Sequence, residues 1–152
     1  MAHKLLLLIH LVGFAAYLGA GFAQQKFMGR SAQSGVAGAV RDEYERLSAA
    51  VITRIELPSL FVQVATGVIF LVLAPVWLTQ GWLHGKLACV LALLVLSHLE
   101  MFNARKIVRA RAARGEAASA EIAERKARHR MLGTIGSVAV VLVVGLVAFG
   151  TG

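Results

Sequence analysis

The sequence contains few charged residues: 16% of its 152 residues are Asp, Glu, Lys or Arg, whereas 58% are hydrophobic. Soluble domains usually have about 25% charged residues, so this composition excludes an ordinary soluble domain. Acidic residues are especially scarce, with 8 Asp and Glu against 16 Lys and Arg, and the formal net charge is +8. The length allows one domain, which we place over residues 1–152.

Several chemical motifs are also missing. The only cysteine, Cys89, lies in an apolar run, which excludes an intrachain disulfide and a cysteine-based metal cluster. There is no phosphate-binding glycine loop and no HExxH motif. We also identify no paired carboxylates within an apolar segment, as proton-driven transporters tend to use. No hydrolase pattern is present, and a transporter is disfavoured.

What the sequence does contain is apolar runs long enough to cross a hydrocarbon core of about 30 Å. They occupy residues 5–23, 57–78, 82–101 and 131–149. We therefore predict an all-α fold, an integral membrane four-helix bundle. The first run, with Lys4 before it and small residues at its end, would also suit a secretory signal peptide. We interpret it as the first transmembrane helix.

The basic residues are confined to alternate loops. Of the 16 Lys and Arg, five lie between residues 24 and 55 and nine between residues 102 and 131. This is the positive-inside pattern of a membrane protein rather than a basic groove for nucleic acid. It places loops 24–56 and 102–130 in the cytoplasm and both termini outside, which is typical of a multi-pass protein of a bacterial-type inner (cytoplasmic) membrane.

The loops themselves carry helical patterns. Val40, Tyr44, Leu47 and Val51 follow the spacing of an amphipathic helix. The 102–130 loop is rich in helix formers and predicts a solvated helical hairpin that breaks at Gly115. In the second run, Pro58 suits a helix start and Pro75 predicts a loosened last turn.

Histidines mark two of the apolar runs. His84 and His98 are fourteen residues apart, so they lie within about 40° of one helix face, with Leu91 between them. Lys86 points elsewhere. Because ionisable groups within a membrane are costly, these residues are candidates for a functional site. Alternatively, His84 reaches the interfacial water and His98 hydrogen-bonds a neighbouring helix.

His10, on the first run, shares a helix face with Gly13 and Tyr17. A glycine one turn from a histidine leaves space for a flat ligand, or simply allows close helix packing. Their depths predict that His10 meets His84 or Lys86 in the outer leaflet. Paired imidazoles suit haem iron, and imidazole also suits copper.

The remaining ionisable groups have simpler interpretations. Lys86 and Lys26 suit carboxylates such as porphyrin propionates. Glu56 lies just before the second apolar run and Glu100 near the end of the third, both on the cytoplasmic side. We expect them to form surface pairs with arginines there. His129 lies between two arginines, and we interpret it as part of a solvated charged run.

Three stretches together resemble a known family. They are His10-Leu11-Val12-Gly13 with Tyr17 on the first run, Pro58 at the start of the second, and Trp82-Leu83-His84-Gly85-Lys86-Leu87 at the start of the third. This combination is similar to the HemJ-type protoporphyrinogen oxidases, within a wider group that includes the CopD-like copper proteins. The resemblance implies a b-type haem protein that oxidises protoporphyrinogen IX to protoporphyrin IX, with His10 and His84 in the haem site and Lys86 contacting cofactor or substrate.

Our leading hypothesis is therefore a haem b membrane oxidoreductase that passes electrons to a respiratory-chain or quinone partner. His10, His84, Lys86, Gly13 and Tyr17 are its candidate cofactor-binding residues, and His10, His84 and His98 its candidate metal ligands. The alternatives are a CopD-like copper-handling protein and a cofactor-free structural subunit. Besides the lipid bilayer, the expected partners are further copies of the chain or a larger membrane complex, and not nucleic acid.

Overall fold

The protein is all-helical, and the computed structural model describes residues 1–150, which contain no strand. The helices, in chain order, are α1 (Ala2–Ser31), α2 (Gly38–Val51), α3 (Leu57–Leu73), α4 (Gly81–Arg114) and α5 (Ser119–Gly150). Short turns of other helical types connect them: η1 (Ile52–Glu56) is π-helical, whereas η2 (Pro75–Thr79) and η3 (Gly115–Ala118) are 3-10 turns.

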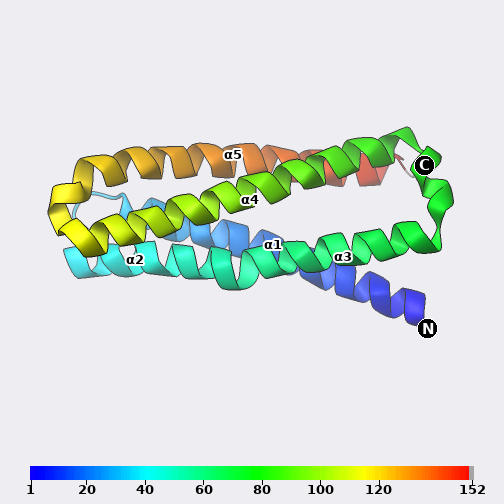
Figure 1. Ribbon diagram of the computed structural model, residues 1–152, viewed down its shortest axis with the longest axis horizontal. Coiled ribbons are helices and arrows are strands. Elements are labelled where there is room, and N and C mark those ends of the chain that lie inside the picture. Colours follow the sequence, from blue (N-terminus) through cyan, green and yellow to red (C-terminus); the bar gives the residue numbers. More distant parts are fainter. Residues whose placement is uncertain (151–152) are drawn as a thin grey trace.

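The helices lie lengthwise against one another in an elongated bundle (Figure 1). α4 and α5 run back side by side, and α1 lies along the continuous α2–η1–α3 segment. One end of the bundle carries both termini and the α3–α4 connection, and the other carries α2 and the α4–α5 turn. We refer to them as the terminal end and the turn end.

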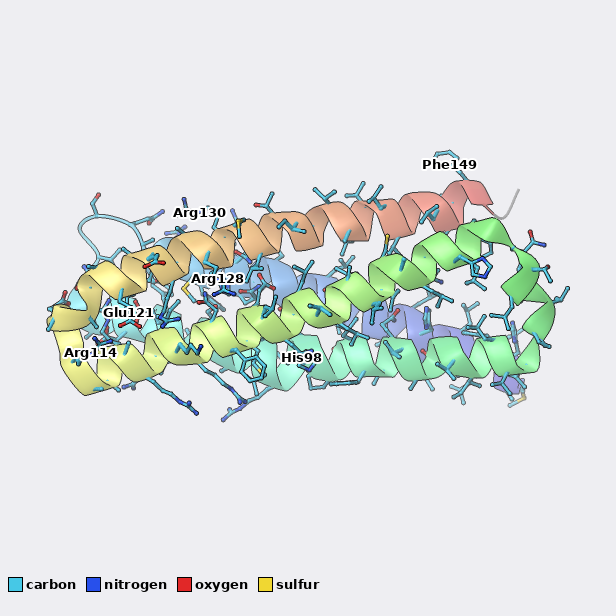
Figure 2. All side chains as sticks on the ribbon, turned by 45° about the horizontal axis from the view of Figure 1, so that its top comes forward. His98, Arg114, Glu121, Arg128, Arg130 and Phe149 are labelled. Atoms are coloured by element: carbon cyan, nitrogen blue, oxygen red, sulfur yellow. The ribbon has the colours of Figure 1, made fainter. Side chains whose placement is uncertain are left out.

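The apolar surface indicates a membrane protein. Large hydrophobic side chains are exposed along α1, α3, α4 and α5, including Leu8, Val72, Leu91 and Phe149; Phe149 projects outward from α5 in Figure 2. Three helical stretches are long and apolar enough to cross a membrane: Ala2–Ser31, Gly38–Leu73 and Gly81–Gly150. The third folds back at η3, so that it comprises both α4 and α5.

Glycine and proline set the ends of the helices. Gly115 has a φ of 53°, in the region that other residues rarely adopt, and the predicted break there is confirmed. The predicted second run, 57–78, extends too far, because α3 ends at Leu73 and Pro75 begins the 3-10 turn η2. Pro75 thus ends the helix instead of only loosening its last turn.

The second proline is accommodated within a continuous helical segment. Pro58 lacks the N–H that would bond to the carbonyl four residues back, and its ring crowds that turn. The backbone just before it is widened into η1, where the Leu57 N–H bonds to Ile52 O, five residues back. Such π-turns often occur at functional sites, and this one ends at Glu56.

The predicted helix around Val40 and Val51 is confirmed as α2; its apolar residues Val40 and Leu47 are exposed, whereas its polar residues Glu45 and Ser48 are buried. The prediction of a solvated 102–130 hairpin is wrong. It continues α4 and α5 and contributes Ala104, Ile107 and Ile122 to the core at the turn end. The bundle therefore extends beyond its apolar belt.

Candidate functional site

His10 lies half-buried between α1 and α3. Its Nδ1 is 2.7 Å from Thr66 Oγ1, and the Thr66 hydroxyl lies 2.7 Å from Val62 O. Because that hydroxyl donates its only proton to the carbonyl, we infer that the His10 Nδ1–H donates to Thr66. His10 Nε2 then carries a free lone pair. Lys86, on α4, is close enough for its charge to interact with His10.

The other two predicted histidines lie elsewhere. His84 is exposed, and in residues 1–150 no hydrogen bond or ring contact joins it to His10. His98 is half-buried, its Nδ1 donates to Leu94 O at 2.7 Å, and its ring meets Phe61 edge-on (Figure 2). Since Leu91 is also exposed, the predicted stripe lies largely on the outside of the bundle.

Gly13 and Tyr17 are both buried on the inner face of α1. A Cβ added to Gly13 would lie 3.1 Å from Gln63 Nε2 and 3.3 Å from Val62 Cγ1, so α3 fills the space beside the glycine. This favours close packing over a cradle for a flat ligand. The Gln63 amide also donates to the His10 carbonyl oxygen.

Tyr17 belongs instead to a polar core inside the bundle. The Tyr17 hydroxyl is 3.3 Å from Ser97 Oγ, and Ser97 donates to Glu56 Oε1 at 3.0 Å. Glu100, one turn after Ser97 on α4, accepts a 2.6 Å hydrogen bond from Gln25 Nε2. Both carboxyl groups are buried, at 2% and 5% exposure. We call Tyr17, Ser97, Glu56, Glu100 and Gln25 the carboxyl core.

His129 closes this core on the side of α5. It is fully buried, and its Nε2 donates to Gln24 Oε1 at 2.6 Å. Ser48 Oγ is 3.4 Å from the same amide oxygen. Glu56 Oε2, Asn103 Oδ1 and His129 Nδ1 are buried without a hydrogen-bond partner in residues 1–150. The predictions of a solvated His129 and of surface glutamates are therefore wrong.

A separate ionic cluster lies nearer the turn end. Buried Glu45 contacts Lys126 Nζ at 2.7 Å and Arg111 Nη2 at 3.2 Å. Arg111 also pairs with Asp42, and the backbone oxygen of Ser31 accepts from Lys126. We call Glu45, Arg111 and Lys126 the ionic cluster. It joins α2, α4 and α5 and has a structural role.

Sequence reasoning missed the carboxyl core, although two spacings pointed to it. His10, Tyr17, Gln24 and Ser31 follow one another at intervals of seven, which places polar groups along one face of α1. On α5, Ile122, Lys126, His129 and Leu132 share the buried face. Arg128 and Arg130, the neighbours of His129 in sequence, are exposed on other faces of α5, so they do not indicate the surroundings of His129.

Comparison with known proteins agrees with the membrane assignment. A family model described as a predicted integral membrane protein (DUF2269) matches residues 4–150, and the chain therefore belongs to this family. No curated protein matches the chain, and no solved structure does. The family description gives the membrane location and names no cofactor, substrate or reaction.

Proposed function

The chain belongs to a family of integral membrane proteins, and we propose that it crosses the membrane four times, with α1, α3, α4 and α5. α4 has 34 residues and is about 50 Å long, which exceeds a hydrocarbon core of about 30 Å. The terminal end fits the membrane, because its exposed side chains are apolar. The basic turn end would then lie in the cytoplasm of a bacterial-type inner membrane, with both termini outside.

Within this frame we propose a haem-type membrane oxidoreductase with its site at His10. The observation that carries the proposal is the hydrogen bond from His10 Nδ1 to Thr66, which fixes the ring and leaves Nε2 free. Metal-binding histidines are commonly held by their second nitrogen in this way. Lys86 is a suitable partner for an anionic group beside the ring.

The residues fit haem in part. His10 supplies the type of nitrogen that binds haem iron, and Lys86 a cation for a propionate. Gly13 does not fit the role of a flat cradle, since Gln63 and Val62 occupy that space. Because His84 is exposed, we base the proposal on His10 and not on a pair of histidines.

Bound haem would supply one-electron chemistry between a reduced substrate, such as the protoporphyrinogen IX of the HemJ-type resemblance, and a quinone or respiratory partner. The chain's own contribution is orientation and charge. Thr66 holds the His10 ring through Nδ1 and so prevents Nδ1 from competing with Nε2 as a ligand. Lys86 would compensate a carboxylate of the bound group, and the surrounding helices would limit access of water.

The test is the reduced-minus-oxidised visible spectrum of the detergent-purified protein. We expect b-type haem bands that are lost in His10→Ala, weakened in Lys86→Met and retained in His84→Ala, the matched control on the exposed face. A flat spectrum from protein made with a sufficient haem supply would contradict the haem proposal and the oxidase reaction with it. Copper bound at His10 would then support the CopD-like alternative, and a stable association with other membrane subunits the structural one.

A further inference from the structure

Glu56 and Glu100 are two buried carboxyl groups without a cation. No lysine, arginine or histidine in residues 1–150 forms an ion pair with either of them. They interact electrostatically with each other. An unpaired buried charge costs several kcal/mol, and two like charges in one site cost more. This arrangement disfavours a state in which both carboxyl groups are ionised.

The hydrogen bonds around the pair indicate where charge and proton reside. Ser97 donates to Glu56 Oε1, so the Tyr17 hydroxyl donates to Ser97 Oγ in turn. This chain of donors favours a negative charge on Oε1 of Glu56. The second oxygen, Oε2, is buried and has no partner. It is an acceptor left unfilled by the side chains around it, which adds to the cost of keeping Glu56 charged.

We propose that the buried pair Glu56 and Glu100 forms a proton-binding site that takes up one proton and exchanges it with the turn-end surface. When two carboxyl groups interact in a site that disfavours charge, one of them stays protonated while the other is ionised. Residues 1–150 contain no group of three or more His, Cys, Asp or Glu side chains suited to a metal ion. A proton is the cation that two carboxyl groups and neutral donors can hold. The site does not depend on a cofactor at His10.

The route to the surface passes along Gln25. This side chain bonds to Glu100 and also lines a surface hollow of about 330 Å³ with Lys26, Arg30 and Gln33. Gly133 on α5 leaves room for it, since a Cβ there would be 1.8 Å from Gln25 Nε2. Glu100 is therefore one side chain away from the surface. Movement of Gln25 into that hollow would open the carboxyl pair to water.

The groups that face the pair are neutral or of the same sign. Tyr17 approaches from α1, Ser97 from α4, and His129 lies beside Gln25, whose amide is 3.5 Å from the His129 carbonyl oxygen. The buried Lys and Arg side chains of residues 1–150, Arg111 and Lys126, are already bound to Glu45 in the ionic cluster. Uptake of a proton is therefore the available way to offset the second charge.

Infrared spectroscopy of the full chain in lipid nanodiscs tests this proposal. At neutral pH we expect the carbonyl stretch of about one protonated carboxyl group per chain, which disappears at alkaline pH and shifts after transfer to D₂O. Glu56→Gln and Glu100→Gln should each move its frequency or titration midpoint, and the double variant should abolish it. Glu124→Gln, at an exposed position, is the matched control and should leave the band unchanged.

Three other results would each contradict the proposal. Wild-type protein without a protonated carboxyl band at neutral pH would overturn it without recourse to any variant. A band that responds to only one of the two substitutions would show an isolated acid rather than an interacting pair. A band that does not shift in D₂O over hours would rule out exchange with the surface.

Discussion

Two sets of buried glutamates lie in this bundle, a few turns apart, and they are stabilised in opposite ways. In the ionic cluster, Glu45 contacts both Lys126 and Arg111. In the carboxyl core, Glu56 and Glu100 receive only hydrogen bonds from Ser97 and Gln25. Burial is similar, at 1% exposure for Glu45 and 2% for Glu56. Burial alone therefore does not indicate the role of an acidic residue; its partners do.

This difference in partners suggests a structural role for the ionic cluster and a functional role for the carboxyl core. A buried ion pair is a contact between fixed charges, and it locks α2 against α4 and α5 at the turn end. A carboxyl pair without cations can change its charge by taking up or releasing a proton. The second arrangement includes the π-turn η1, a feature frequent at functional sites, and the unpartnered Glu56 Oε2, a buried acceptor for which the helix packing gives no structural reason.

Replacing a buried glutamate by glutamine should change the free energy of unfolding very differently in the ionic cluster and in the carboxyl core, and this is the largest effect we expect. Glu45→Gln leaves the buried charges of Arg111 and Lys126 without their shared partner, and we expect a loss of about 3 kcal/mol in the free energy of unfolding. Glu56→Gln removes a charge that has no cation, and we expect a change of less than about 1 kcal/mol or a gain in stability. Denaturant unfolding in one detergent at neutral pH compares them. Equal losses would remove the distinction between the sites.

We expect a smaller change in stability when either of two glycines on α5, Gly133 or Gly136, is replaced by alanine. Gly133→Ala would place a Cβ within 1.8 Å of Gln25 Nε2 and push this side chain off Glu100, with a cost of about 1–2 kcal/mol. Gly136→Ala, one turn along, meets nothing within 4 Å and should gain up to about 1 kcal/mol in helix propensity. Thermal unfolding measures both. If the two variants behave alike, the Gln25 contact with Glu100 has no energetic role.

The smallest effect should come from the exposed pairs at the α4–α5 turn, where Arg114 and Glu121 lie next to one another (Figure 2). Hydrogen bonds from Arg114 and Arg125 hold the pKa of Glu121 below its usual value. A lowered pKa means that the pairing stabilises the turn above the ordinary glutamate range and is lost as the pH falls through the folded value.

NMR titration of labelled glutamates measures this directly. We expect the Glu121 carboxyl group to titrate below about 4.3, the value in a free peptide, and Glu121→Gln to leave the unfolding midpoint at neutral pH unchanged within error. A Glu121 midpoint at or above the ordinary value would contradict the pairing. A large loss of stability would indicate that exposed pairs matter here as much as the ionic cluster does.

The positions of the predicted histidines show what residue spacing can and cannot predict. The face of α1 shared by His10, Gly13 and Tyr17 was predicted from their spacing, and it is the inner face. The shared face of His84, Leu91 and His98 was predicted in the same way, but it lies largely outside. Spacing gives the angle between side chains on one helix. It does not give the direction of the bundle axis, which depends on the neighbouring helices.

The sequence by itself determined the all-helical, membrane-type composition, the break at Gly115 and the alternation of basic and apolar segments. These follow from local physics: apolar run length, glycine geometry and charge. The tertiary structure decided the burial of Glu56, its interaction with Glu100, and the burial of His129. Each of these joins helices more than 40 residues apart in sequence or depends on such a contact, so no local window of sequence contains the information.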